Sequence, residues 1–412
     1  MRTKEVMRRT ENLSPVFYTR GLNAPFTEGH IQIVRMITKS LLLYGTQSVI
    51  FNFKYNVGES HAGDDLACKF RIEQRIPKVS RNNVLSGRGR SIFAYSLLME
   101  TLGTPKFLLS EHALRHENYI VNIVNCFRYP RIFAKKILKA PVVLHFYIPH
   151  LRGRYMLRLF GNEADLFIAS SQGVAQYLDE CGVTKGKIAV VYPPVDTELY
   201  KPLSKHLVRS QLDLLKENKI ILYMGNLKPT RFPEDKILRV TEELVKDIPE
   251  TLLLIFAPKN NLNIKRANEI RMKAEMLSLV DTVKVCVENL SEKEKTSIYA
   301  ASDIFFFPES GSRAAVEPPL TVLEAMASGR VVFAPKLSAS SELITDGKNG
   351  FLFEEKDYNT LARRFADILM NKELRIRVSR CARQTVEQKL SLSTIGSNML
   401  KHFRALTSEQ RR

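Results

Sequence analysis

Two glutamates stand on either side of an expected helix start, with six residues between them. Glu317 is followed by a pair of prolines, which disfavour a helical conformation in the residue before each of them. A helix is expected to begin near Thr321, where apolar residues recur at helical spacing, and to end at Gly329. Glu317 therefore lies in the loop before the helix, whereas Glu324 lies about one turn inside it.

The start of this helix is a candidate anion site. The backbone N–H groups of Leu320, Thr321 and Val322 would be free there, and free donors at a helix N-terminus suit a diphosphate. Glu324 could accept hydrogen bonds from the hydroxyls of a ribose, as acidic residues do in nucleotide-binding Rossmann units. The alternative is structural, with Glu317 as a partner of the helix dipole and Glu324 as an exposed helix residue.

The elements that would position these residues alternate in type. Short apolar, β-branched or aromatic runs are expected as strands at 15–18, 48–53, 91–95, 107–109, 142–146, 166–169, 188–192, 220–224, 251–256, 282–285, 304–307, 331–333 and 351–353. Helix-length segments are expected at 31–43, 233–246, 265–277, 292–300, 321–327, 358–370, 372–387 and 391–406. This alternation predicts βαβ units and parallel sheets. Two such series, one in each half, predict an α/β protein with two Rossmann-like domains.

The boundary between the two domains is expected in the segment 192–202. Its prolines bias the backbone to extended forms and stop regular elements. The expected division is a first domain over 1–200, a second over 201–390 and a C-terminal helical segment over 391–412. The chain has 412 residues, so each half is long enough to build its own core.

The composition excludes several classes of protein. Hydrophobic residues make up 44% and charged residues 25%, which is ordinary globular usage and excludes a disordered or collagen-like chain. No apolar run approaches the ~18 residues of a membrane span. The charged N-terminus leads into no apolar segment of the kind found in signal peptides. Five widely spaced cysteines without a CxxC pair favour reduced thiols in a cytoplasmic protein and argue against a cysteine-based zinc site.

The charge of the chain suggests a polyanionic partner. Lysine and arginine number 62 against 43 acidic residues, a formal net charge of +19. The segment 128–158 holds eight basic residues and no acidic one, interleaved with aromatic and aliphatic side chains. This mixture favours contact with an anionic membrane surface over a solvated basic face. Nucleic acid is the least favoured partner, since no RNP-like motif, zinc-finger spacing or helix-turn-helix signature is present.

Several motifs resemble one known family. The segment 317–329, Glu-Pro-Pro-Leu-Thr-Val-Leu-Glu-Ala-Met-Ala-Ser-Gly, resembles the donor-binding signature of the retaining family-4 glycosyltransferases of GT-B type, glycosyl transferases group 1. Segment 221–231 resembles the family's strand and glycine turn that carry two basic phosphate ligands. Segment 290–308 resembles the family's helix and following strand that lead to the site. Segment 342–353 resembles a turn that comes later in the family's sequence. The resemblance covers most of 140–366 and is weaker around 25–45.

This resemblance implies a GT-B fold, in which two Rossmann-like domains face each other across a cleft. The first domain, 1–200, would bind the acceptor, and the second, 201–390, would bind the nucleotide sugar. The C-terminal segment 391–412 could pack back on the first domain, as the last helix does in similar folds.

The donor motifs depart from the family's pattern in two places. The family commonly separates its two glutamates by seven residues, whereas six lie between Glu317 and Glu324. Glu324 is placed by the run Glu-Ala-Met-Ala, so it is a firmer assignment than Glu317. In the glycine turn that begins at Gly225, Asn226 stands where the first basic ligand is expected, and Arg231 matches the second. Asn226 can donate a hydrogen bond but brings no charge. Either Lys228 compensates, or Arg231 does more of the work through its bidentate fork.

The first half carries two weaker signals by the same resemblance. Similar proteins have a glycine-rich loop before helix 31–43 that approaches the donor phosphates, and Gly29 is the residue left of it here. The alternative is a simple turn before the helix. A site histidine is expected after strand 142–146, and both His145 and His150 qualify. His145 is preferred as a residue near the sugar, although its place within the strand also suits a core residue.

The resemblance implies transfer of a sugar from a nucleoside-diphosphate donor to an acceptor, with retention of configuration. Arg231 and the helix start at 320–322 would stabilise the leaving diphosphate, and Glu317 and His145 would be the catalytic residues. The sequence has no DxD motif, so no metal and no other cofactor is expected. The pair His112 and His116 has no evident third ligand, which argues against a metal there.

The expected acceptor is lipid-linked, at a membrane surface, because of the basic segment 128–158; a saccharide acceptor is the other option. The expected location is the cytoplasm, with peripheral attachment to the cytosolic membrane face. Two other classes of function stay open. One is a catalytically inactive GT-B binding protein, suggested by Asn226 and the shortened glutamate spacing. The other is a nucleic-acid-binding protein, suggested by the charge alone.

Overall fold

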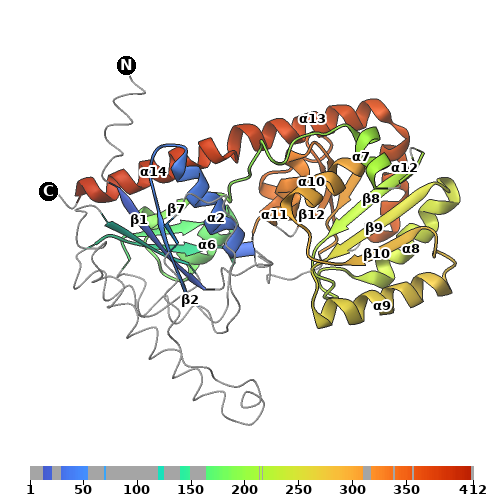
Figure 1. Ribbon diagram of the computed structural model, residues 1–412, viewed down its shortest axis with the longest axis horizontal. Helices are drawn as coiled ribbons and strands as arrows, with labels where there is room; N and C mark the ends of the chain where they lie inside the picture. The colour runs from blue at the N-terminus through green and yellow to red at the C-terminus, as the bar shows by residue number, and fades with distance from the viewer. Residues whose placement is uncertain are drawn as a thin grey trace, which may run out of the picture. The chain divides into compact units, whose positions relative to one another are not determined.

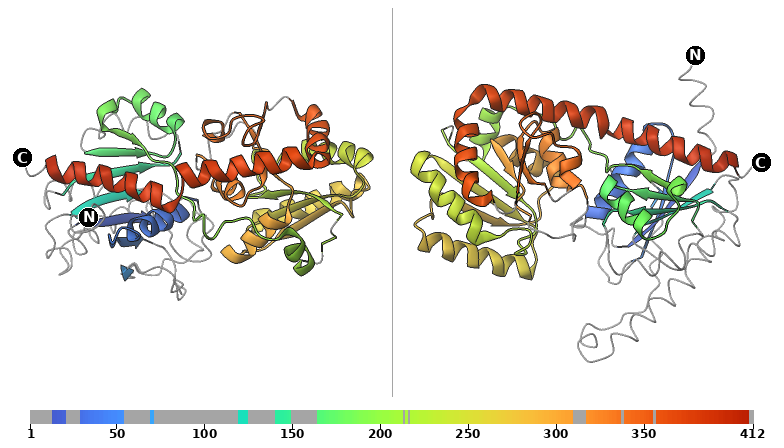
Figure 2. Two further views of the ribbon diagram at one scale, coloured as in Figure 1. Left: turned by 90° about the horizontal axis from the view of Figure 1, so that it is seen from above. Right: turned by 180° about the vertical axis from the view of Figure 1, so that it is seen from behind.

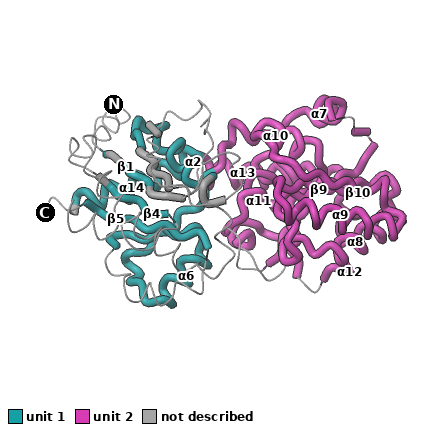
Figure 3. The backbone as a smooth tube through the Cα atoms, turned by 60° about the horizontal axis from the view of Figure 1, so that its bottom comes forward, with its two compact units in different colours: residues 1–194, 392–412 teal, residues 195–391 magenta. Residues whose placement is uncertain are grey.

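The computed structural model describes residues 13–20, 29–53, 69–70, 119–124, 140–148, 164–212, 214–215, 217–309, 317–336, 339–354 and 357–409. The chain divides into two compact units, Met1–Pro194 with Leu392–Arg412, and Val195–Ser391 (Figure 3). The division falls inside the proline-containing segment 192–202 and places the last helix with unit 1. Within the described ranges, no helix is both long enough and apolar enough to cross a bilayer.

In the described part of unit 1, seven strands form a parallel sheet in the order β3-β2-β1-β4-β5-β6-β7 (Figure 1). Every described residue of β5 and β6 is buried, as expected for parallel strands covered on both faces. The strands are β1 (Ser14–Arg20), β2 (Val49–Phe53), β3 (Lys69–Phe70), β4 (Tyr119–Val124), β5 (Val142–Phe146), β6 (Leu166–Ala169) and β7 (Ile188–Val190).

The described helices of unit 1 are α2 (Gly29–Leu42), α6 (Gln172–Glu180) and α14 (Leu392–Glu409). Helix α14 packs on α2, although the two lie at opposite ends of the sequence (Figures 1 and 2). The contact is close at Gly396, where a Cβ atom would stand 2.5 Å from the carbonyl oxygen of Ser40. The Tyr44 hydroxyl also donates a hydrogen bond to the Ser393 carbonyl at 2.9 Å.

Unit 2 contains a six-stranded parallel sheet in the order β10-β9-β8-β11-β12-β13. The chain runs from β8 toward one edge and then restarts at β11 on the other side of β8. The switch point therefore lies between β8 and β11, and ligands of such sheets bind at the carboxyl ends of these strands. The strands are β8 (Lys219–Met224), β9 (Thr251–Ala257), β10 (Val283–Val287), β11 (Ile304–Phe306), β12 (Val331–Pro335) and β13 (Phe351–Phe353).

A cluster of buried apolar side chains joins helices of unit 2 to its sheet. Phe306 of β11 lies at the centre, with its ring centroid 5.6 Å from that of Phe353 and 5.1 Å from that of Phe365. Its helices are α7 (Lys205–Gln211), α8 (Glu234–Asp247), α9 (Asn261–Met276), α10 (Glu292–Ala301), α11 (Leu320–Ala327), α12 (Tyr358–Met370) and α13 (Lys372–Lys389).

The elements expected from the sequence are present wherever they fall on described residues, with ends shifted by a few positions. The expected strands 91–95 and 107–109 lie outside the described residues. Strands β3 and β4 and the helices α6 and α7 were not expected. The two parallel sheets confirm the α/β prediction with two Rossmann-like domains.

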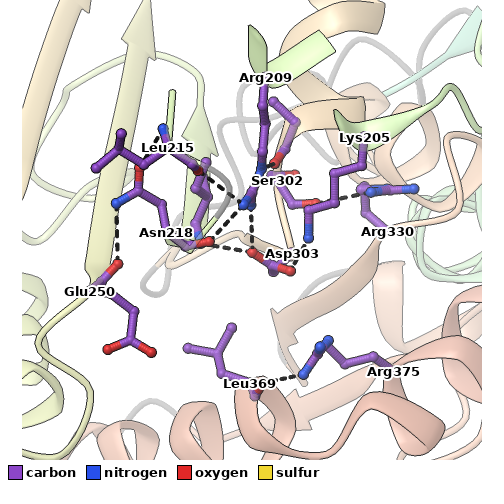
Figure 4. A network of polar contacts seen from close by, with 12 residues as sticks. Lys205, Arg209, Leu215, Asn218, Glu250, Ser302, Asp303, Arg330, Leu369 and Arg375 are labelled. Atoms are coloured by element: carbon purple, nitrogen blue, oxygen red, sulfur yellow. Dashed lines mark hydrogen bonds and ion pairs between the residues drawn. The ribbon is translucent and has the colours of Figure 1, made fainter. Parts of the chain in front are cut away.

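A polar network holds α7 at the amino end of β11 (Figure 4). Asp303, directly before β11, accepts a hydrogen bond from Arg209 Nη2 at 2.9 Å and pairs with Lys205. The same carboxylate accepts the backbone N–H of Ile220 in β8 at 2.9 Å. Arg209 also donates from Nε to the carbonyl of Ala301 at 2.9 Å, so the network joins α7, α10, β8 and β11.

Candidate functional site

The turn after β8 is built around a close approach that requires glycine. A Cβ atom on Gly225 would stand 2.8 Å from the hydroxyl oxygen of Tyr223. That hydroxyl donates a hydrogen bond to the carbonyl of Asn226 at 2.7 Å, and the Gly225 N–H donates to the carbonyl of Phe256 at 2.9 Å. These bonds fix the path of the chain where it leaves the sheet.

Asn226 shapes the rest of this turn. Its side-chain oxygen accepts the backbone N–H of Lys228 at 3.1 Å, which is an Asx turn. The carbonyl of Lys228 in turn accepts the N–H of Arg231 at 2.8 Å, while the side chain of Lys228 is exposed. The amide oxygen of Asn226 is therefore committed to the loop, which leaves the exposed Lys228 and the nearby Arg231 as the cations of the turn.

Arg231 meets a carboxylate that the sequence reasoning did not single out. Arg231 Nε lies 3.5 Å from Glu309 Oε1, and its guanidinium lies over the ring of Phe307, 5.7 Å from the centroid. Glu309 follows β11 and Arg231 follows β8, so the pair spans the switch point of the sheet. An acid two residues after the strand-like run 304–307, at the same sheet edge as the expected donor loop, is a signal that could have identified it.

The carboxyl of Glu309 is poorly stabilised as an anion. Only 6% of its side chain is exposed, and Oε1 has no hydrogen-bond partner among the described residues. Burial raises its pKa to about 7, against the lowering effect of Arg231 and with a further rise from nearby Glu317. The two acids that flank the 310–316 segment and the cation of the β8 loop thus form one electrostatic group.

Helix α11 begins at Leu320, after an uncapped Pro319. The expectation of three free N–H groups is wrong for Val322, which donates to the carbonyl of Pro319 at 3.0 Å because the first turn is tight. For the N–H groups of Leu320 and Thr321, no hydrogen-bond partner occurs among the described residues. Two donors rather than three are therefore available at this helix start for an anion.

Glu324 lies on the side of α11 that faces α10. The hydroxyl of Tyr299 donates to Glu324 Oε2 at 2.8 Å, and the hydroxyl of Tyr200 donates to Glu292 close by. Burial raises the pKa of Glu324 to about 7, opposed mainly by the cation of Lys295. Glu324 is therefore not the exposed helix residue of the structural alternative. Its carboxylate is oriented by a buried tyrosine.

His145 lies in the core of the unit 1 sheet, with 2% of its surface exposed. Its Nε2 is 3.0 Å from Oδ1 of Asn122 on the neighbouring strand β4, and its Nδ1 is 3.1 Å from the Tyr147 hydroxyl. Burial lowers its pKa to about 3, so the ring is neutral at physiological pH. These are the surroundings of a core histidine, and a role near the sugar stays a prediction. His150 lies outside the described residues.

Gly29 is the first residue of α2, and the residues 21–28 before it lie outside the described ones. In the described part of the chain, no group of three His, Cys, Asp or Glu side chains could hold a metal ion. The pair His112 and His116 also lies outside that part. Apart from Gly29, the expected donor-site residues all lie in unit 2.

Two family models match the chain in sequence. The model described as "Glycosyl transferases group 1" matches residues 204–385, and the one described as "Glycosyltransferase Family 4" matches residues 83–199. The first match contains Gly225, Arg231 and Glu324, and the second ends at residue 199, within the segment 192–202 in which the two units divide. The chain belongs to the family-4 glycosyltransferases. The family that the sequence motifs resemble is therefore the one to which both models point.

Curated relatives of this glycosyltransferase-family chain are distant. One is the D-inositol 3-phosphate glycosyltransferase of Streptosporangium roseum, 28% identical over 217 residues, which are 50% of this chain and 48% of that protein. Another is the spore coat protein SA of Bacillus subtilis, 25% identical over 53% of this chain and 59% of that protein. The chain spans about half the length of the first curated relatives that it matches.

Solved structures of similar fold cover nearly the whole glycosyltransferase-family chain. Sucrose-phosphate synthase of Thermosynechococcus elongatus superposes with a TM-score of 0.73 over 96% of this chain and 100% of that chain, at 16% identity. The complex of Anabaena HepE with UDP superposes with a TM-score of 0.70 over 95% of this chain and 100% of that chain, also at 16% identity. These likenesses confirm the GT-B class of the two sheets.

Proposed function

We propose that the chain transfers a sugar from a nucleoside-diphosphate donor to an acceptor hydroxyl. The observation that carries this proposal is the arrangement of charge at the carboxyl edge of the unit 2 sheet. Arg231 lies on one side of the switch point, and α11 begins, with the N–H groups of Leu320 and Thr321, in the connection that follows the other strand. A guanidinium and two backbone donors are suited to a diphosphate.

The chemistry breaks the bond between the anomeric carbon and a diphosphate oxygen and forms a bond from that carbon to the acceptor oxygen. The acceptor hydroxyl gives up its proton to the released diphosphate or to water. Negative charge grows on the diphosphate as the bond breaks, so Arg231 and the start of α11 would stabilise the transition state more than the ground state. Glu324, oriented by Tyr299, would accept hydrogen bonds from the ribose hydroxyls.

The finer parts of the proposal rest on the sequence. Retention of configuration, a catalytic role of Glu317 and His145, and an approach of Gly29 to the donor phosphates follow from the resemblance to the family. A lipid-linked acceptor at the cytosolic face of a membrane is supported by the eight basic residues of 128–158. HepE of Anabaena, crystallised with UDP and glucose, supports a nucleotide sugar as the donor class.

The first experiment is a thermal-shift screen with UDP, GDP, ADP and their sugar conjugates. A ligand at 100 times its Kd should add about 2.7 kcal/mol to the unfolding free energy. We expect one base to stabilise the protein far more than the other two. The absence of any shift would contradict the proposal, since a donor site must bind its nucleotide.

The second experiment measures transfer with the nucleotide sugar selected by the screen. Lipid-linked and saccharide acceptors are compared, and the anomeric configuration of the product is read by NMR. Arg239→Ala is the matched control for Arg231→Ala, because it removes an exposed arginine side chain on α8. Nucleotide binding without transfer to any acceptor, and without hydrolysis of the donor, would favour the inactive binding protein that Asn226 suggests.

A further inference from the structure

Glu309 is a buried acid of unit 2. The donor site described above does not explain why its carboxylate has so few polar partners. Its carboxylate lies at the carboxyl end of β11, opposite Arg231 from the loop after β8. A buried carboxylate normally has hydrogen bonds that replace those of water, because an unpaired one is costly. In the part of the chain that the structure describes, Glu309 Oε1 has none, and its contact with Arg231 Nε is long, at 3.5 Å.

The pair is therefore incomplete on both sides. Arg231 has a guanidinium that can form two parallel hydrogen bonds with an anion, yet its contact with Glu309 involves Nε at a distance beyond a normal hydrogen bond. Glu309 in turn lies near a second acid, Glu317, which disfavours a second negative charge. Such an arrangement is suited to an additional anion that forms hydrogen bonds with the guanidinium of Arg231.

We propose that Glu309 is a positioning residue of the donor site, which holds Arg231 toward the switch point and takes up a proton when the donor diphosphate binds to that arginine. This inference rests on the proposed function, because it assigns the diphosphate of a nucleotide sugar to Arg231. The proton comes from solvent and remains on the Glu309 carboxyl while the donor is bound.

The direction of the proton transfer follows from charge. Among the described residues, three titratable groups interact with the Glu309 carboxyl: Arg231 from the β8 loop, Glu317 before α11, and Tyr223 of β8. Arg231 favours the ionised carboxyl, whereas burial and Glu317 disfavour it. A diphosphate on Arg231 would cancel the favourable contribution and add negative charge, so the neutral acid becomes the favoured form. Without ligand, the pKa of Glu309 is about 7, so the carboxyl is about half ionised at neutral pH.

The test is isothermal titration calorimetry of the intact chain with the nucleotide sugar that the screen selects. Both phosphates of a nucleotide sugar are esterified, so the ligand itself does not titrate near pH 7. Binding is measured at pH 7 in two buffers with different ionisation enthalpies, which gives the number of protons taken up. We expect wild type to take up about 0.5 proton more per ligand than Glu309→Gln.

A second readout is the dissociation constant between pH 6 and pH 8. From the titration of Glu309, binding should weaken by up to about tenfold over this range, and Glu309→Gln should lose that part of the change. The pKa of Glu324 is also raised to about 7, so Glu324 could contribute to the same pH dependence. The same comparison with Glu324→Gln measures its contribution separately. Glu309→Met, a second neutral variant of similar length, replaces Glu309→Gln if the latter does not fold.

The outcomes separate this inference from the proposed function. Equal proton uptake in wild type and in the neutral variants, with nucleotide still bound, would overturn the role of Glu309 alone. If no nucleotide binds at any pH, the proposed function fails and the inference fails with it. A purely structural role for Glu309 would change stability but would leave the proton uptake on binding unchanged.

Discussion

Strand β11 has a buried acid at each end, and the two acids behave in opposite ways. Asp303 before the strand and Glu309 after it are both less than one-tenth exposed. Burial alone would raise both pKa values. At Asp303, Lys205, the N–H of Ile220 and Arg209 together hold the pKa below its usual value. At Glu309, the lowering effect of Arg231 does not offset burial, and the pKa is about 7.

The difference lies in the partners and not in the depth of burial. Asp303 accepts hydrogen bonds at 2.9 Å from Arg209 and Ile220 and pairs with Lys205, so its charge is fully compensated (Figure 4). The Glu309 contact with Arg231 is 3.5 Å long, and no described residue donates a hydrogen bond to Oε1. A complete network fastens α7 to the sheet, whereas an incomplete pair at the carboxyl edge leaves charge available for a ligand.

The largest expected effect is on stability, at the amino end of β11. Asp303→Ala leaves Arg209, Lys205 and the Ile220 N–H without their shared acceptor, and breaking a buried pair in this way costs about 3–5 kcal/mol. The unfolding free energy is measured by urea titration. Asp235→Ala is the matched control, since its exposed carboxylate pairs with Lys273 at 2.7 Å and should cost less than about 1 kcal/mol. Similar costs for the two variants would contradict the contrast between the strand ends.

The next effect is on function, at the carboxyl end. Arg231→Ala should lower donor-dependent transfer by about 10²–10³-fold, the usual loss for one preorganised donor to a leaving group. Because its contact with Glu309 is long, the same change should leave the urea midpoint nearly unaltered. Arg231→Lys keeps the charge but loses the planar fork, so intermediate activity is expected. Transfer at the wild-type rate in Arg231→Ala would remove this residue from the site.

The sequence predicts the unit 2 elements other than α7 well, because apolar runs and helical periodicity are local. The strand Ile304–Phe306 and the helix Leu320–Ala327 are examples, each found within one residue of its expected start. Strand β4 escaped detection because Asn122 interrupts its apolar run. The structure shows the reason for that polar residue, since Asn122 Oδ1 is 3.0 Å from His145 Nε2 on the adjacent strand.

The candidate site is less accessible to sequence reasoning, because its chemistry depends on contacts between distant segments. Arg231 and Glu324 follow from motifs, but the pairing of Arg231 with Glu309 brings together residues from two loops that only the sheet order makes neighbours. Similarly, nothing local indicates that the Tyr299 hydroxyl would orient Glu324. The Val322 N–H was misjudged because the tightness of a first helical turn is set by the backbone.

The third effect is on the pH dependence of stability. The folded-state pKa of Glu309, about 7, exceeds its ordinary value of 4.5, so the folded chain binds this proton more tightly than the unfolded chain does. The unfolding free energy should therefore fall as the pH rises through this window, by at most about 3 kcal/mol for this group. Glu309→Gln should remove that part of the fall. Asp303 gives the opposite sign, because its lowered pKa loses its stabilising contribution only as the pH falls below 3.8.

Urea titrations of wild type and Glu309→Gln at pH 5 and pH 8 measure this difference. Glu324→Gln is run beside them, because the raised pKa of Glu324 gives the same direction. A fall in stability that is identical in wild type and Glu309→Gln would mean that solvent, and not the protein interior, surrounds the Glu309 carboxyl. The contrast between the two ends of β11 would then be lost.

The smallest effect is expected at Lys228, the exposed cation of the glycine turn. Asn226 brings no charge and uses its amide oxygen on the Lys228 N–H, so a second cation for the diphosphate would come from the Lys228 side chain. Lys228→Ala should weaken nucleotide-sugar binding about two- to fivefold, the scale of an exposed ion pair. The loss should shrink as salt is raised, since exposed charges are screened. Lys265→Ala on α9, also exposed, is the control.

If Lys228→Ala binds the donor as tightly as wild type at low salt, Arg231 is the sole cation of this turn that acts on the diphosphate. The proton taken up by Glu309 then becomes more important, because it is what frees the full charge of that one arginine for the donor.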